Sequence, residues 1–204
     1  SGLKTSRDAW CYNHSKGRLS QNMERMIGFY NSEVARFVKE RSATTAEDFI
    51  DRDNTKISWS SGLLSAFKNQ TELTFQDQHF VSSLYRPFEK RWMYFHRHLN
   101  ERVYQIPKIF PNADTDNLVI AVSGVGTRAG FSCLMTDVIP NLHTVDTGQC
   151  FPLKLYEKQE AGEGLFAGQG NPDDYVARDG ITNEGLQHFQ AAYPGKQFTK
   201  EDLF

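Results

Sequence analysis

The chain has 204 residues, of which 39% are hydrophobic and 24% are charged, and its net charge is -2. This composition is typical of one folded domain and excludes the disordered and fibrous classes. No stretch approaches the roughly eighteen consecutive apolar residues of a membrane helix, and the N-terminus lacks the apolar core of a signal peptide. We therefore expect a cytoplasmic protein with no membrane partner.

The first 70 residues predict helices. Between residues 16 and 41, Leu19, Met23 and other apolar residues recur at helical spacing. Shorter helices are expected at 45–51, which begins with a threonine and two acidic residues, and at 60–69. This third of the chain should pack helix against helix.

From residue 71 the sequence becomes β-rich. Short runs of β-branched and aromatic residues, separated by turn-forming residues, are typical of strands. The runs are 73–75, 80–85, 91–95, 118–122, 131–136 and 151–156.

The last part predicts a loop and a helical tail. The loop follows residue 157 and contains Gly162, Gly164, Gly168, Gly170 and Pro172. A helix is expected at 182–193, and residues 199–202 resemble the capped first turn of another. Because the sequence stops two residues after this first turn, where a helix would begin, we expect that it is truncated.

Together these elements predict a single α+β domain over residues 1–204, with a mixed, mostly antiparallel central sheet. The helical part covers about 1–70, the β-rich part about 71–157, and the loop and tail about 158–204.

The three cysteines indicate the redox state of the compartment. Cys11, Cys133 and Cys150 are odd in number and form no Cys-x-x-Cys pair, so we expect reduced thiols rather than a disulfide framework or zinc site.

Lysine and arginine outnumber acidic residues 7 to 4 in residues 83–128, whereas acidic residues outnumber them 11 to 5 in residues 129–204. This segregation indicates that the middle of the chain could bind an anionic partner.

Two segments are candidates for such binding. Residues 84–97 interleave cations with aromatics, and cations hold phosphates or read guanine while aromatics stack on bases. The alternative is a β-hairpin with its aromatics in the core and its cations solvated. Residues 123–130 (SGVGTRAG) could present backbone amides to a phosphate, although a Gly-rich turn between two strands explains them as well.

Catalytic and metal-binding patterns are weaker. His96 and His98 alternate on a predicted strand, so they should face opposite sides and not share a metal. Asp137, His143 and Asp146 are scattered, and no nucleophile elbow accompanies them, so hydrolysis is a poor third hypothesis. We predict no catalytic residue and no metal site in this sequence.

Four ordered motifs resemble one family. They are residues 2–10 (GLKTSRDAW), 83–88 (SLYRPF), 100–104 (NERVY) and 148–153 (GQCFPL). Together they resemble the C-terminal specificity region of type ISP restriction-modification enzymes and related large predicted helicases. In that family one polypeptide joins a nuclease, a translocase, an adenine methyltransferase and a target-recognition domain. The sequence has no Walker, Asn-Pro-Pro-Tyr or nuclease motif, so S-adenosylmethionine, ATP and Mg²⁺ are implied only for the parent enzyme.

The resemblance implies a non-catalytic module of phage defence that reads a DNA sequence. Its partners would be double-stranded DNA and the methyltransferase domain of the parent chain. From charge and spacing we predict that the DNA-binding residues are Lys4, Arg7, Arg86, Lys90, Arg91, Arg97, Asn100, Arg102, Thr127 and Arg128. The alternative is a scaffold that uses the acidic tail and long helix to dock on the methyltransferase or helicase part.

Overall fold

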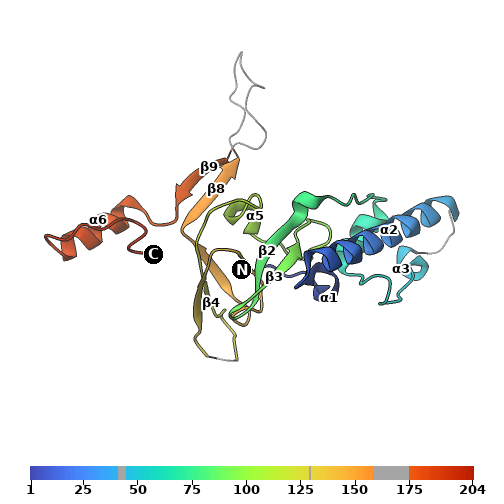
Figure 1. Cartoon of the computed structure of the whole chain (residues 1–204), viewed down its shortest axis with the longest axis horizontal. Coiled ribbons are helices and arrows are strands. Elements are labelled where there is room, and N and C mark those ends of the chain that lie inside the picture. Colours follow the sequence, from blue (N-terminus) through green and yellow to red (C-terminus); the bar gives the residue numbers. More distant parts are fainter. Residues whose placement is uncertain (41–44, 129, 159–174) are drawn as a thin grey trace, which may run out of the picture.

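The computed structural model describes residues 1–40, 45–128, 130–158 and 175–204. The long helix lies at one end, the C-terminal helix at the other, and the strands between them (Figure 1). Apart from Lys158, the Gly-rich segment predicted to be a loop lies outside the described residues. None of the described helices is long and apolar enough to cross a membrane.

The helical part consists of α1 (Asp8–Cys11), α2 (Lys16–Glu40), α3 (Ala46–Phe49) and α4 (Ser61–Lys68), so the three predicted helices are confirmed. The N-cap side chains of Thr45 and Ser60 accept hydrogen bonds from backbone amides of α3 and α4, which explains where these helices begin. The apolar face of α2 packs against α4 and the strands and buries Leu19, Met23, Met26, Ile27, Tyr30 and Val34.

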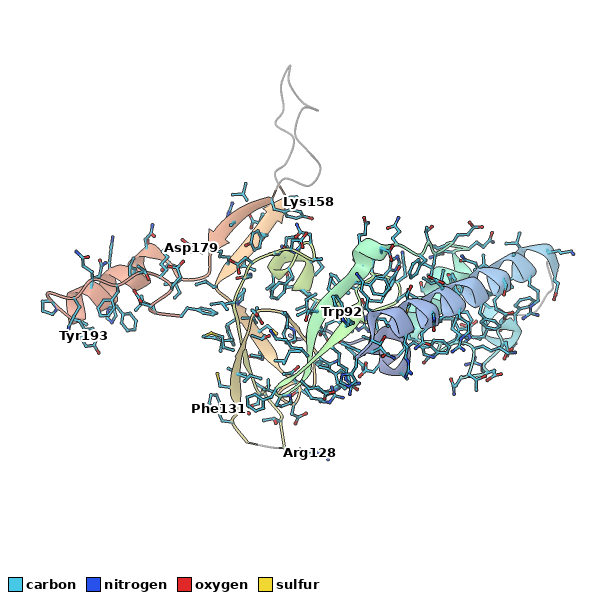
Figure 2. The ribbon with its side chains drawn as sticks, viewed as in Figure 1. Trp92, Arg128, Phe131, Lys158, Asp179 and Tyr193 are labelled. Carbon is cyan, nitrogen blue, oxygen red and sulfur yellow. The ribbon has the colours of Figure 1, made fainter. Side chains whose placement is uncertain are left out.

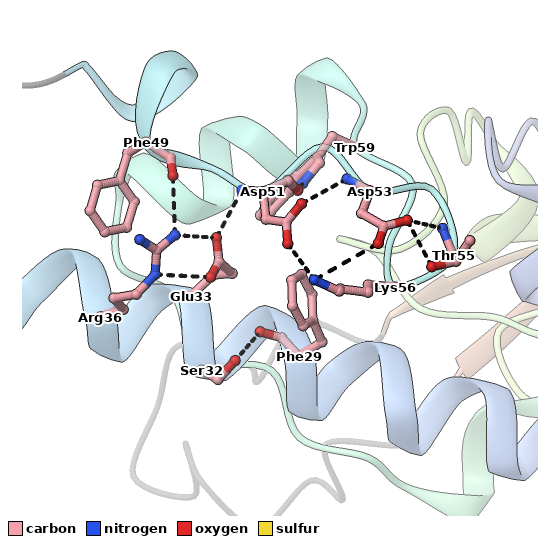
Figure 3. Close-up of polar contacts among 10 residues, drawn as sticks. All are labelled: Phe29, Ser32, Glu33, Arg36, Phe49, Asp51, Asp53, Thr55, Lys56 and Trp59. Atoms are coloured by element: carbon pink, nitrogen blue, oxygen red, sulfur yellow. Dashed lines mark hydrogen bonds and ion pairs between the residues drawn. The ribbon is translucent and has the colours of Figure 1, made fainter.

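A buried carboxylate ties α2 to the loop after α3 (Figure 3). Glu33 accepts two hydrogen bonds from Arg36, at 3.1 and 2.8 Å, and one from the backbone amide of Asp51 at 2.9 Å. Arg36 also donates to the carbonyl of Phe49 at 3.1 Å, and the Trp59 indole donates to that of Asp51 at 2.8 Å. The loop is therefore held by polar contacts as well as by packing.

Two small sheets and a hairpin form the β-rich part. The first sheet has the order β1-β3-β2-β6, and in the described residues its one parallel pair is β2 with β6. The second has the order β5-β4-β7 and is antiparallel, as is the β8-β9 hairpin, so the predicted mixed, mostly antiparallel arrangement is confirmed. The strands are β1 (Tyr12–Asn13), β2 (Phe80–Arg86), β3 (Glu89–Tyr94), β4 (Val119–Val122), β5 (Cys133–Thr136), β6 (Ile139–Pro140), β7 (Gln149–Pro152), β8 (Lys154–Lys158) and β9 (Tyr175–Asp179).

Sheet β1-β3-β2-β6 separates two hydrophobic cores. Successive residues of a strand face opposite sides, so Tyr94 enters the core under α2 while its neighbour Met93 enters the other. Phe80 and Val81 divide in the same way. The second core also holds α5 (Ile106–Ile109), which the sequence patterns did not predict. One sheet therefore joins the helical part to the rest of the strands.

One predicted strand is wrong. Residues 73–75 form no strand and pair with none of the described strands. Instead the side chain of Asn31 donates to the carbonyl of Leu73 at 2.8 Å and accepts from its amide at 3.0 Å. Because a side chain on α2 satisfies these groups, no neighbouring strand is required. The predicted run 151–156 is likewise two elements, β7 and β8.

The C-terminal helix α6 (Asn183–Ala192) confirms the predicted tail and stands away from the strands (Figure 1). It buries no residue, and Phe189 and Tyr193 are 44% and 55% exposed. Beyond it, the Thr199 hydroxyl and the Asp202 carboxylate and amide hydrogen-bond each other in a capped turn.

Candidate nucleic-acid interface

Arg7 is buried, so it does not belong to an exposed interface. It is 3% exposed, and its guanidinium donates to the carbonyls of Ser58 and Leu99 and to the hydroxyl of Ser60. Removal from water lowers the pKa of Arg7. The side chain connects α1 to the start of α4 and to the turn after β3, which corrects its predicted role in DNA binding.

Asn100 is also structural. It is 2% exposed, its side-chain oxygen accepts from the amide of His96 at 2.8 Å, and its side-chain nitrogen donates to the carbonyl of Tyr94 at 3.2 Å. These bonds close the turn after β3. An asparagine so enclosed cannot present its amide to an adenine edge, so this prediction is corrected too.

Arg86 and Arg91 both pack against one tyrosine ring. Their guanidinium carbons are 3.9 and 4.0 Å from the ring centre of Tyr85. Arg91 also pairs with Glu89 at 2.6 Å, and Arg86 donates to Asn141 at 3.3 Å. Both side chains are partly exposed and held in place, an arrangement that suits planar recognition of a phosphate or a guanine edge.

Lys90 lies on the other side of β3 from Arg91, since neighbouring strand residues alternate. Its ammonium is 2.7 Å from the carboxylate of Asp137, and this hydrogen bond lowers the pKa of Asp137. The pair is solvent-exposed and mutually neutralised, so Lys90 contributes less positive potential than the other predicted cations.

Lys4 and Arg102 meet across a short backbone bridge. The amide of each donates to the carbonyl of the other, at 3.0 and 2.9 Å, which places both exposed side chains on one side of the bridge. Arg102 and the exposed Arg97 line one groove with Tyr104. In the part of the chain that the structure describes, none of these three cations forms an ion pair with an acidic residue.

The segment after β4 is a structured turn joining β4 to β5, as the alternative interpretation predicted. The hydroxyl of Thr127 donates to Asp146 at 2.9 Å, and the backbone amide of Arg128 approaches the same oxygen at 3.3 Å. A Cβ on Gly124 would lie 2.3 Å from the carbonyl oxygen of Thr147, so only glycine fits there. Arg128 is exposed at the end of the turn (Figure 2).

Contacts connect most of the predicted cations. Lys4, beside Arg102, also lines a small groove with Asp8 and Asn141, and both of those residues reach Arg86. The structure thus brings Arg97, Arg102, Lys4, Arg86 and Arg91 into one chain of neighbours. Arg7 and Asn100 are buried, and Lys90 is paired with Asp137. We name the exposed and unpaired members, together with Arg128, the open cations: Lys4, Arg97, Arg102 and Arg128.

Sequence reasoning missed Tyr85 as the support of two arginines. Its ring meets Arg91 because β2 and β3 pair in antiparallel register, with a shift between Leu84 and Arg86. That register could not be read from spacing alone. The sequence did carry a signal at the turn after β4, because Val125 and Phe131 are apolar residues beside glycines, a place where solvent exposure is expected.

The prediction that His96 and His98 face opposite sides is wrong. They lie in the turn after β3, where their ring centres are 5.8 Å apart, and the ring of His79 is 4.9 Å from that of His96. Burial, together with these two histidines, lowers the pKa of His96 to about 4. Across the described residues no group of three or more histidine, cysteine or acidic side chains is arranged to hold a metal ion.

Solved structures of three enzymes resemble this chain. A nuclease-deletion mutant of the type ISP restriction-modification enzyme LlaGI, in complex with a DNA substrate mimic, is 33% identical over 76% of the chain, with a TM-score of 0.74. The DrdV–DNA complex is 29% identical over 100% of the chain, with a TM-score of 0.80. The ATP-dependent type ISP enzyme LlaBIII bound to DNA is 26% identical over 98%, with a TM-score of 0.77.

The chain corresponds to a small part of these enzymes, namely 15%, 18% and 12% of their respective lengths. Comparison with curated proteins finds no match. The family of type ISP C-terminal specificity domains matches residues 1–204. Because that match spans the whole sequence, and the three structures share its fold, the chain belongs to the type ISP C-terminal specificity domain family.

Proposed function

We propose that this chain is a DNA target-recognition module that positions a larger restriction-modification polypeptide on duplex DNA. The observation that carries the proposal is the set of open cations, which lie in a specificity domain whose solved relatives are DNA complexes. A lysine or arginine without an acidic partner can neutralise a phosphate and release its counterion. Phosphate contacts of this kind would set the position of the module on DNA.

Base reading would then fall to side chains that are held rigidly. Arg86 and Arg91, fixed on Tyr85, keep guanidinium N–H groups within a defined plane. A planar fork of donors matches the two acceptors of a guanine edge in the major groove. We assign these two arginines to base recognition and the open cations to the DNA backbone.

We assign no turnover to this chain. Nuclease, translocase and methyltransferase chemistry, with the S-adenosylmethionine, ATP and Mg²⁺ that it uses, would belong to other parts of the parent polypeptide. We further propose that the methyltransferase part of the parent polypeptide is an intramolecular partner of this domain.

The test is fluorescence-anisotropy binding of the chain to random-sequence duplex DNA across a salt series. The variant replaces all four open cations by alanine. The matched control replaces Lys90 and Asp137, whose charges cancel. Removing one phosphate contact should reduce the slope of log affinity against log salt by about 0.9, so the variant's slope should fall by up to about 3.6 while the control's remains unchanged. Equal slopes in wild type and variant would contradict the proposal.

A second candidate function is docking on the rest of the parent polypeptide, and one observation favours it. Met135 and Phe151 pair with Ile120 from either side, so the three side chains lie together on one face of sheet β5-β4-β7. Met135 and Phe151 are 51% and 53% exposed. This face carries no lysine or arginine of β4, β5 or β7, so a protein surface suits it better than DNA.

Cys133 provides a built-in probe of this docking. It pairs with Val122 on the same face and is exposed, whereas Cys11 is buried. In a longer polypeptide that contains this domain, docking should protect Cys133 from alkylation, while a cysteine placed at the exposed Ser82 should stay reactive. Equal labelling of Cys133 in the domain and in the longer polypeptide would reject docking through this face.

A further inference from the structure

The turn that joins β4 to β5 ends in two apolar side chains that pack on nothing. Val125 is 96% exposed and Phe131 is 84% exposed. Arg128 lies between them in sequence, and Figure 2 shows Arg128 at the free end of this hairpin and Phe131 beside the strand just above that end. Exposing a phenylalanine in water contributes nothing to folding, so this side chain is available to a partner that could cover it.

The base of the turn is well anchored. Ser123 accepts a hydrogen bond from the amide of Ser132 at 2.8 Å and donates to the carbonyl of Gly130 at 3.0 Å. The Thr127 hydroxyl and Arg128 amide bonds to Asp146 attach the other side of the turn to the segment before β7. The exposed side chains are therefore presented from a fixed support, and little conformational entropy would be lost when they bind.

Charge identifies the partner. The guanidinium of Arg128 forms no ion pair in the described part of the chain, and the nearby carboxylate of Asp146 is engaged by Thr127. An unpaired cation beside exposed apolar side chains fits a polyanion with a stackable interior, which is duplex DNA.

We propose that Phe131, assisted by Val125, enters duplex DNA as a wedge between adjacent base pairs while Arg128 contacts the groove beside it. This inference rests on the proposed DNA-binding function and deepens it. Apolar side chains inserted at a base step partly unstack and kink the duplex, at a cost that depends on the step. Pyrimidine–purine steps unstack most easily, so the wedge would contribute specificity at a position where no base edge is read.

The experiment measures DNA unwinding at matched occupancy. A closed circular plasmid is relaxed by a topoisomerase in the presence of the chain, with occupancy set by anisotropy, and the shift in linking number reports insertion between base pairs. Wild type should shift the linking number of the plasmid. Phe131→Ala should lose most of this shift and bind DNA about 5- to 100-fold more weakly. Phe131→Trp, which keeps an aromatic ring, should retain the shift. Arg128→Ala should weaken binding and reduce its salt dependence.

Phe189→Ala is the control, because it removes a phenylalanine that is 44% exposed on α6, a helix that carries none of the open cations. It should behave as wild type. Binding without a shift in wild type, or an equal loss of the shift in Phe189→Ala and Phe131→Ala, would overturn the wedge and leave the DNA-binding function standing. Failure of folded wild type to bind DNA would overturn both. Circular dichroism confirms that each variant is folded, as expected for substitutions at exposed positions.

Discussion

Two charged side chains of the helical part, Arg7 and Glu33, are enclosed by partners that the fold supplies, whereas the open cations, which lie in turns and in one backbone bridge, reach solvent without an acidic partner. Arg7 and Glu33 have 3% and 5% of their surface exposed, and each makes several hydrogen bonds. Arg97 and Arg102 are exposed and have no ion pair in the described residues. The same residue types therefore stabilise the fold in one region and remain available for a ligand in the other, and stability measurements should separate the two.

The largest effect is expected at Arg7. Replacement by alanine removes charged hydrogen bonds to two carbonyls and a hydroxyl in a buried site, so the free energy of unfolding should fall by about 3 kcal/mol. Urea unfolding monitored by tryptophan fluorescence measures it. Arg97→Ala is the control and should leave the midpoint almost unchanged; a similar decrease in both variants would erase the distinction between the two regions.

Glu33→Ala comes next. It would leave the amide of Asp51 without its acceptor and free Arg36 from its main partner, at a cost of about 2 kcal/mol. The matched control is Glu40→Ala, because Glu40 lies 3.9 Å from the same arginine but is exposed. Removing that surface contact should cost less than about 1 kcal/mol in the same unfolding assay. Comparable costs would mean that burial does not set the strength of the contact.

Protonation of His96 should make the free energy of unfolding depend on pH. Because burial lowers its pKa from 6.5 to about 4, the unfolded chain binds a proton in this interval that the folded chain does not. Its contribution to stability is full above pH 6.5 and declines as the pH falls toward 4, by about 1 to 2 kcal/mol after allowance for partial solvation. His96→Gln should reduce this decline in urea unfolding, whereas His188→Gln, on exposed α6, should not.

The smallest effect on stability is expected for the open cations. Replacing Lys4, Arg97, Arg102 and Arg128 by alanine should change the free energy of unfolding by less than about 0.5 kcal/mol for each site, as is usual for exposed positions. Thermal melts followed by circular dichroism test this. A variant that loses DNA binding while keeping its melting temperature sharpens the comparison, and one that unfolds would show that these residues are structural.

Periodicity predicted those parts of the fold whose structure depends on local pattern. The apolar spacing from Leu19 onward located α2, and alternating runs located most of the central strands, because burying one face imposes a period on the sequence. The pattern failed at residues 73–75, where the partner of the backbone is the side chain of Asn31 on α2. Nothing in the local sequence distinguishes that partner from a strand.

The candidate site was harder to predict, because burial is a tertiary property. Arg7 and Asn100 have the residue types of a DNA contact, and the packing of α1 and of the turn after β3 encloses them. The cations of β2 and β3 are partly or fully exposed, and the support of Arg86 and Arg91 by Tyr85 depends on strand register. DNA contacts by the remaining residues stay predictions, since they require the bound complex.

The position of the first few residues affects how this molecule can assemble. Leu3 is fully buried, donates to the carbonyl of Pro140 at 2.9 Å and accepts from Leu142 at 2.7 Å, while Gly2 donates to Gly148 at 3.0 Å. Residues 2 and 3 can therefore pair only after residues 140–148, which lie far later in the sequence, have been synthesised. Closing so long a loop is slow, because its entropy is lost before the contacts form. The Lys4–Arg102 bridge is therefore expected among the last features to appear in folding, so the surface acquires its binding geometry only when residues 1–148 are complete.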